Sequence, residues 1–161
     1  MLPIAKRHHT RNTLSTILRM AKIMNEIFKT YRPKGFRTVN SYLFVENPEA
    51  LIDFLKKAFY AEEINRSINP DNGDIANSIL KIGDSCFMIS QAREEFLGMK
   101  TSLYLFVDNV DAVYKRAIEN KGKNVFEPTN MEYEDRQAGI TDPSGNYWWI
   151  SKRLIEREYH E

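Results

Sequence analysis

Hydrophobic and polar positions follow the same order twice along the chain. Residues 42–47 read Tyr-Leu-Phe-Val-Glu-Asn, and residues 104–109, 62 positions later, read Tyr-Leu-Phe-Val-Asp-Asn. Each copy starts with a short apolar run typical of a strand. Apolar residues at helical spacing follow, over about 48–59 and about 110–121. The chain therefore contains an internal duplication, and Asn47 and Asn109 stand where a helix N-cap is expected.

Three shorter strand patterns complete each copy. They cover about 62–68, 74–82 and 85–90 in the first copy, and about 123–127, 136–141 and 146–152 in the second. Turn residues separate them, including Asp142-Pro143-Ser144-Gly145. We therefore predict an α+β domain made of two βαβββ modules, 38–90 and 101–152, joined by residues 91–100.

An amphipathic helical pattern precedes the duplicated part. From Thr13, apolar residues follow a spacing of three and four, and the run Pro33-Lys34-Gly35 ends the pattern. The apolar positions are Leu14, Ile17, Leu18, Ala21, Met24, Ile27, Phe28 and Tyr31. Thr13 and Ser15 are the candidate N-caps. We therefore divide the chain into an N-terminal arm, 1–35, and a domain, 36–161.

Charge is unevenly divided between these two parts. Residues 1–35 contain eight Lys or Arg and one acid, Glu26, whereas 36–161 contain fifteen Lys or Arg and twenty-one acids. Three interpretations of the basic arm stay open. Met24 is the natural start of the protein, the arm is a helix that docks on the domain or on a partner, or it is an organelle transit peptide.

Composition excludes several classes of function. The net charge of +1 predicts no nucleic-acid partner, because the domain lacks a basic field. No apolar run approaches the roughly 18 residues that span a membrane. A single cysteine excludes an intramolecular disulfide and a multi-thiolate metal site. We expect a cytoplasmic protein with no membrane partner.

Several short motifs occur in an order that suggests a family. They are Tyr42-Leu43-Phe44-Val45, Ile82-Gly83-Asp84-Ser85, the run 107–112, and Asp135-Arg136 followed by the run 142–148. Together with the duplication, these motifs resemble the vicinal oxygen chelate superfamily, which includes glyoxalase I, extradiol dioxygenases and bleomycin-resistance proteins. The chain is most similar to the small bacterial glyoxalase/bleomycin-resistance-like proteins. The resemblance implies a cupped mixed sheet covered by helices, a ligand inside the cup and a homodimer.

Strand alternation then assigns side chains to the cup. Leu43 and Val45 are expected to pack on a helix, so their neighbours face the cup, and the second module follows by equivalence. The expected cup residues are Asn40, Tyr42, Phe44, Met88, Ser102, Tyr104, Phe106, Tyr147 and Trp149. Arg136 is a candidate anion-binding residue at the mouth of the cup, with a surface ion pair as the alternative. Cys86 is interpreted as a buried structural thiol.

The residues at the family's metal positions decide the expected chemistry. The resemblance places metal ligands, usually His and Glu, at positions that hold Asn40, Met88, Ser102 and Trp149 here. Asn and Ser are poor ligands for a divalent ion, Met is a weak soft one, and Trp does not ligate. The domain has no histidine before His160. We therefore expect no metal, no cofactor and no catalytic residue.

These expectations combine into one leading hypothesis. The protein is a metal-free binder of a small aromatic or amphipathic molecule in an aromatic-lined cup, and it forms a homodimer. One alternative is a metal-dependent lyase, isomerase or dioxygenase of the same superfamily. The other is an interaction protein that docks through its N-terminal helix.

Overall fold

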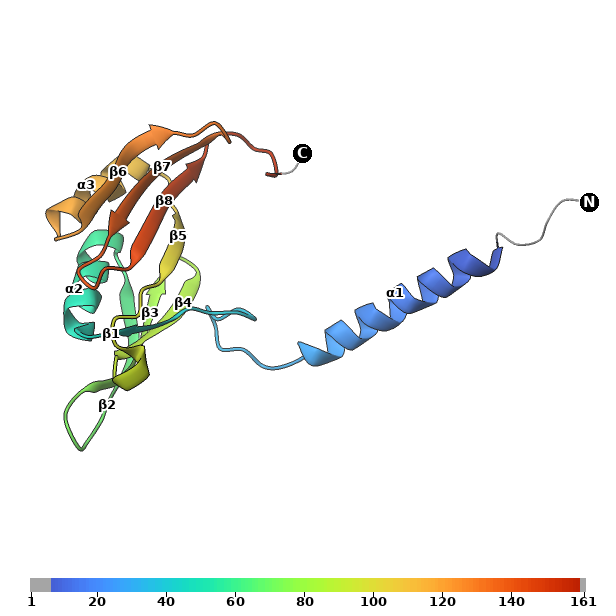
Figure 1. Ribbon diagram of the computed structural model, residues 1–161, viewed down its shortest axis with the longest axis horizontal. Helices are drawn as coiled ribbons and strands as arrows, with labels where there is room; N and C mark the ends of the chain where they lie inside the picture. Colours follow the sequence, from blue (N-terminus) through green and yellow to red (C-terminus); the bar gives the residue numbers. More distant parts are fainter. Residues whose placement is uncertain (1–6, 160–161) are drawn as a thin grey trace, which may run out of the picture. The chain divides into compact units, whose positions relative to one another are not determined.

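The computed structural model describes residues 7–159, and side chains from Thr13 onward (Figure 1). The chain divides into two compact units between Thr38 and Val39. The first unit contains the helix α1, Arg7–Ile27. This helix begins earlier and ends earlier than its apolar pattern predicts, so Thr13 and Ser15 lie inside it and do not cap it. The side chain of Arg32 donates to the carbonyl of Phe28, just beyond the last turn.

The second unit contains two βαβββ modules of the same topology. Module one comprises β1 Tyr42–Val45, α2 Pro48–Phe59, β2 Glu62–Ile68, β3 Ile75–Ile82 and β4 Ser85–Gln91. Module two comprises β5 Ser102–Phe106, α3 Val110–Glu119, β6 Lys123–Asn130, β7 Asp135–Thr141 and β8 Tyr147–Arg153. The predicted α+β class and the two modules are therefore confirmed.

Each module forms its own four-stranded mixed sheet. The strand orders are β1-β4-β3-β2 and β5-β8-β7-β6. The first strand of each module pairs in parallel with the last, and the other pairs are antiparallel. The helix between the first two strands makes the crossover that leaves those strands unpaired with each other.

Both helices start at the predicted asparagines. Asn47 Oδ1 accepts a hydrogen bond from the backbone N–H of Ala50 at 3.0 Å, and Asn109 Oδ1 accepts from that of Ala112 at 3.0 Å. Each cap satisfies a backbone donor that a helix start leaves without a partner. The duplication in sequence therefore extends to the local structure of the helix ends.

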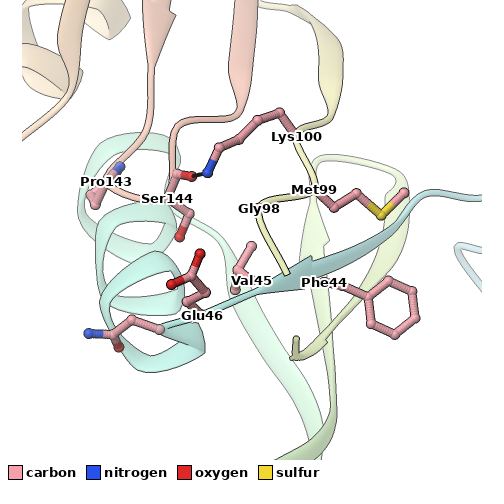
Figure 2. Close-up of a pocket in the computed structure, with 9 residues that line it drawn as sticks. Phe44, Val45, Glu46, Gly98, Met99, Lys100, Pro143 and Ser144 are labelled. Carbon is pink, nitrogen blue, oxygen red and sulfur yellow. Dashed lines mark hydrogen bonds between the residues drawn. The ribbon is translucent and has the colours of Figure 1, made fainter. Parts of the chain in front are cut away.

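The junction between the modules carries a short 3-10 helix, Glu94–Phe96, and then runs past the turn before β8. Lys100 Nζ donates to the carbonyl of Ser144 at 2.5 Å, as Figure 2 shows. The backbone N–H of Thr101 donates to Asn146 Oδ1 at 3.0 Å. A hollow of about 200 Å³ lies beside this contact. Lys100, the basic residue that lines it, already donates its hydrogen bond to the turn. These contacts fix the entry into β5 against the start of β8.

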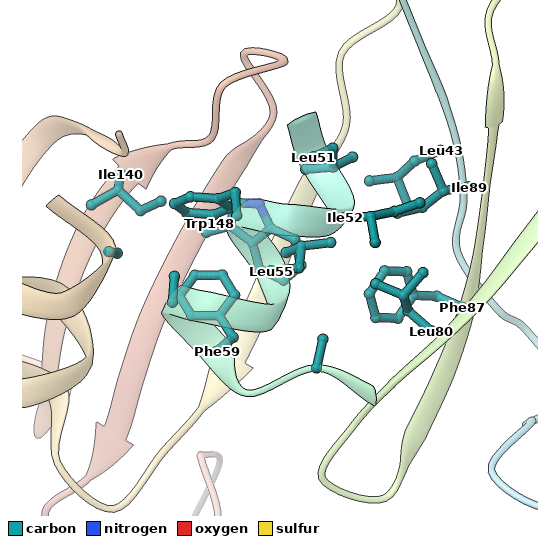
Figure 3. Close-up of a cluster of buried hydrophobic side chains, with 14 of the residues drawn as sticks. Leu43, Leu51, Ile52, Leu55, Phe59, Leu80, Phe87, Ile89, Ile140 and Trp148 are labelled. Carbon is teal, nitrogen blue, oxygen red and sulfur yellow. The ribbon is translucent and has the colours of Figure 1, made fainter. Parts of the chain in front are cut away.

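One apolar core lies between the sheets and the two helices. Leu43, Leu80, Phe87 and Ile89 come from the first sheet, and Ile140, Trp148 and Ile150 come from the second. Figure 3 shows α2 between these two groups. Phe59 of α2 contacts Trp148, with ring centroids 4.9 Å apart. Leu43 and Val45, which were predicted to face a helix, both lie in this core.

The helices of the described residues include none that is long and apolar enough to cross a membrane.

Candidate ligand-binding site

The sheet faces opposite the helices are rich in partly exposed aromatic side chains. Along β5, Tyr104 and Phe106 are 47% and 59% exposed. Along β8, Tyr147 is exposed and Trp149 half-buried, whereas Trp148 between them is 2% exposed. In module one, Tyr42 is exposed, and Phe44 and Met88 are half-buried. Alternation thus sends one set of side chains to the core and the other to an open aromatic face.

Trp149 is the centre of this aromatic face in module two. Its ring stacks on Tyr147 with centroids 6.0 Å apart, and on Phe126 of β6 at 6.0 Å. Gly139 of β7 lies beneath them: a Cβ there would be 2.6 Å from Phe126 Cε1 and 3.2 Å from Trp149 Cζ3. The absence of a side chain at Gly139 therefore lets the two rings lie flat across the sheet.

The indole N–H of Trp149 donates to Ser102 Oγ at 2.7 Å. These two residues occupy the metal positions that the resemblance assigns to module two, and they bind each other. In module one, Met88 pairs across β4 and β1 with Tyr42. Among side chains 13–159, no three His, Cys, Asp or Glu lie together in a way that could hold a metal ion. The donor set at these positions does not fit a divalent ion.

A buried carboxylate lies beside the aromatic face. Asp135, the first residue of β7, is 0% exposed. Its Oδ1 accepts from Arg153 Nη1 at 3.0 Å, and its Oδ2 accepts from the hydroxyls of Tyr159, Tyr104 and Ser151 at 2.7, 3.2 and 3.2 Å. Burial raises the pKa of Asp135, but the hydrogen bonds outweigh it, so the net pKa is lowered. The group is thus held as a carboxylate, which only accepts hydrogen bonds.

The phenol of Tyr104 connects this carboxylate to the rest of the face. The side-chain amide of Gln137 donates to the Tyr104 hydroxyl, and Tyr133 lies 3.0 Å from Gln137 Oε1. A pocket of about 430 Å³ opens over this network and is lined by Tyr104, Phe106, Tyr133 and Tyr159.

Sequence reasoning found half of the side chains that line this pocket. Of its four aromatics it named Tyr104 and Phe106, and it did not place Tyr133, Gln137 or Tyr159. Alternation along β7 would have found Gln137, because Asp135, Gln137 and Gly139 stand two positions apart. No local pattern indicates Tyr159, which lies beyond the last strand.

Module one repeats part of this arrangement. The hydroxyl of Tyr42 lies 2.6 Å from Ser90 Oγ, just as that of Tyr104 lies 3.0 Å from Ser151 Oγ. Ser78 pairs with Ile89 in module one as Ala138 pairs with Ile150 in module two, so these positions are equivalent. Three residues earlier in each strand, Ile75 takes the place of Asp135. The pocket here is smaller, about 280 Å³, and Phe96 stacks on Phe44 beside it at 4.3 Å. The carboxylate is therefore specific to module two.

The expected place of Arg136 at the mouth of the cup is wrong. Its guanidinium forms a bidentate pair with Asp111 of α3, both contacts at 2.6 Å, and also donates to Asn130 Oδ1. The pair holds the pKa of the Asp111 carboxyl below its usual value. Adjacent strand residues point to opposite faces, so Asp135 on the cup side places Arg136 on the helix side. Arg136 forms the surface ion pair that was its alternative.

Asn40 precedes β1 and is half-buried. Cys86 is buried, as expected for a structural thiol.

The duplicated modules, each with a helix-covered mixed sheet, define a two-module protein of vicinal oxygen chelate architecture. A model of the Glyoxalase/Bleomycin resistance protein/Dioxygenase superfamily matches residues 36–150. The chain belongs to this superfamily.

Several known proteins are similar to this chain. An uncharacterized protein of Mycobacterium bovis is 26% identical over 129 residues, covering 73% of this chain and 84% of its own. The crystal structure of TioX from Micromonospora sp. ML1 has a TM-score of 0.59 at 19% identity, covering 76% of this chain and 100% of TioX. Glyoxalase I from Zea mays has a TM-score of 0.59 at 15% identity, covering 73% and 47%. At these identities the two structures show the shared fold alone.

Proposed function

We propose that the protein is a metal-independent, cytoplasmic binder of a small aromatic or amphipathic molecule. The observation that carries this proposal is the hydrogen bond between Trp149 and Ser102. Residues at the family's metal positions are used to orient an indole ring. Lewis-acid chemistry needs imidazole or carboxylate ligands, which these positions do not supply.

The class of ligand follows from the surface around Trp149. Flat aromatic rings with few polar groups favour a ligand that stacks, and a few polar atoms orient it. Here Tyr104, Tyr147, Phe106 and Trp149 supply the rings, and the Tyr104 and Ser102 hydroxyls supply polar points. In module one Tyr42, Phe44, Met88 and Asn40 would form the smaller wall. We assign this binding to the domain 36–161 and treat residues 1–35 as a separate arm.

A homodimer is part of the proposal. Large rings such as Phe106, Tyr147 and Tyr42 remain exposed on the described faces of one chain. The two sheets share no strand pairing, and the resemblance implies that each supplies half of a cup. A second copy of the chain would cover these faces and remove apolar surface from water.

Native mass spectrometry of untagged protein purified without chelator tests the proposal directly. We expect a dimer of metal-free chains, and a retained organic adduct would identify the ligand class. One metal ion per chain would contradict the proposal and favour the metal-dependent enzyme.

A planar dye supplies a second test that needs no knowledge of the natural ligand. We expect 1-anilinonaphthalene-8-sulfonate to bind the protein, and Trp149→Ala to weaken its binding by more than about 1 kcal/mol. Tyr60→Ala is the matched control, since Tyr60 is exposed at the end of α2, away from this face. Equal dye affinities for the native protein and Trp149→Ala would rule out stacking on Trp149.

A further inference from the structure

The segment after β8 folds back onto the face of module two. The backbone N–H of Leu154 donates to the carbonyl of Glu134 at 2.9 Å, and Arg157 pairs with the Glu134 side chain at 2.9 Å. Arg153 Nε donates to the carbonyl of Arg157 at 3.2 Å. These contacts bring Tyr159 over the start of β7. We name residues 154–159 the C-terminal strap.

The strap ends with a phenol on the buried carboxylate. The Tyr159 hydroxyl is 2.7 Å from Asp135 Oδ2, closer than the hydroxyls of Tyr104 and Ser151. The guanidinium of Arg153 lies 4.4 Å from the centroid of the Tyr159 ring. The ring also lines the pocket of about 430 Å³ with Tyr104, Phe106 and Tyr133. With 54% of its surface exposed, Tyr159 lies over the pocket without being enclosed by it.

We propose that the pocket over Asp135 recognises a phenol, and that Tyr159 is a tethered phenol which the ligand displaces. This inference rests on the proposed function and names the ligand class of one part of the same face. The molecule itself shows the mode of binding: an aromatic ring among aromatic walls, with its hydroxyl donating to a carboxylate.

The hydroxyl is needed because of the state of Asp135. Removing a donor from a buried carboxylate costs free energy, because the charged acceptor loses a strong hydrogen bond. A ligand ring without a hydroxyl would displace Tyr159 and leave Oδ2 without its shortest hydrogen bond. A phenol restores that bond, which is strong because the acceptor is charged. Sites of this kind reject analogues that lack the donor.

The surroundings also disfavour a cationic ligand. Arg153 contacts Asp135 Oδ1 at 3.0 Å and balances its charge. An ammonium group in this pocket would approach a guanidinium as well as a carboxylate. An aliphatic alcohol would supply the donor but would not stack on Tyr104 and Tyr133. The ring and the hydroxyl are therefore both required.

The experiment uses p-cresol, which is the side chain of tyrosine as a free molecule. Its binding to the full-length native protein and to Tyr159→Ala is measured by calorimetric titration. We expect Tyr159→Ala to bind p-cresol several-fold more tightly, because removing a tethered competitor raises the affinity by about one plus the ratio of its effective concentration, which is millimolar, to the dissociation constant of the free phenol. Tyr159→Phe, which keeps the ring and loses the hydroxyl, should show a smaller gain. Tyr60→Ala is the matched control: its ring also lies under a guanidinium, that of Arg116, but outside the pocket.

A second probe, 4-methylanisole, tests the hydroxyl, since it has the same ring without a donor. We expect Tyr159→Ala to bind 4-methylanisole at least about tenfold more weakly than it binds p-cresol, because only the phenol donates to Asp135. The proposal is overturned if Tyr159→Ala binds p-cresol no better than the native protein, or worse. It is also overturned if Tyr159→Ala binds 4-methylanisole as tightly as p-cresol, since the pocket would then be merely apolar.

The two proposals fail separately. Dye binding that depends on Trp149, with no effect of Tyr159→Ala on p-cresol, removes only the phenol site. The reverse result removes stacking on Trp149 and leaves the phenol site in place.

Discussion

Gly139 and Phe126 approach so closely that a Cβ at position 139 would lie 2.6 Å from the ring. Trp149 rests on the same glycine from the next strand, at 3.2 Å from the same point. The flat aromatic face of module two therefore depends on a residue that has no side chain. Its conformation is ordinary strand, so the requirement for glycine here comes from space and not from the backbone.

Gly139→Ala should disturb this face. The added methyl group forces Phe126 and Trp149 apart, at a cost of about 1–3 kcal/mol in the free energy of unfolding. Dye affinity should fall as well, because Trp149 tilts. Thermal melting and dye titration measure the two effects. In a protein that already carries Phe126→Ala, Gly139→Ala should lower the free energy of unfolding much less than it does alone. Equal effects in the two backgrounds would contradict the contact between Gly139 and Phe126.

Arg136→Gln should leave ligand binding unchanged. Its partner Asp111 belongs to α3 on the helix side, away from the aromatic face. We expect a small decrease in melting temperature, and the decrease should shrink in high salt because the pair is partly exposed. Dye affinity is the second measurement. The dye is an anion, so a large fall in its affinity would indicate that Arg136 contacts the ligand at the mouth of the cup.

Asp135→Asn should change how stability depends on pH. The pKa of Asp135 is lowered in the folded protein, so its contribution is present above the unfolded carboxyl value of about 3.9 and is lost as pH falls through the lowered pKa. At pH 7 we expect the variant to be less stable by about 1–3 kcal/mol. The difference from the native protein should narrow below about pH 4.

Urea unfolding at pH 7 and at acid pH checks this prediction. Some dependence on pH will remain in the variant, because Glu63 contributes in the same direction. Burial raises the pKa of Glu63, but hydrogen bonds from Arg66, Lys56 and Ser78 outweigh it and lower the value to about 2. A difference between Asp135→Asn and the native protein that is constant with pH would show that folding does not lower the pKa of Asp135.

Deletion of residues 1–23 should leave the domain intact. The chain divides into units between Thr38 and Val39, and every core residue belongs to the second unit. We expect the same melting temperature and the same dye affinity. Native mass spectrometry of the shortened chain also tests how the dimer forms. Loss of the dimer with unchanged dye binding would favour the alternative in which the α1 helix docks on a partner.

Much of the fold was predictable because its signals are local. The predicted helix 48–59 has the observed bounds, and both asparagine caps are present. One strand was cut short: β6 was expected to end at about 127 and continues to Asn130 past Pro128. This strand lies at the edge of its sheet, where a proline costs no ladder hydrogen bond, and its register shifts there.

The candidate site was predictable only in part. Alternation placed Tyr104, Phe106, Tyr147 and Trp149 on the open face, because a strand's side chains change sides at every residue. The same rule separates Asp135 from Arg136, but it was not applied to this pair, and Arg136 was expected at the mouth of the cup. The strand begins at Asp135, one residue earlier than expected.

The sequence by itself determined the two modules, the starts of α2 and α3, and the division of each strand into a core side and an open side. These follow from periodicity, capping and residue chemistry, which act within a few residues. Only the tertiary structure decided that Arg136 pairs with Asp111, that Gly139 makes room for two rings, and that Tyr159 returns to Asp135 across 24 positions. Such contacts depend on where distant segments meet, and no local pattern encodes that meeting.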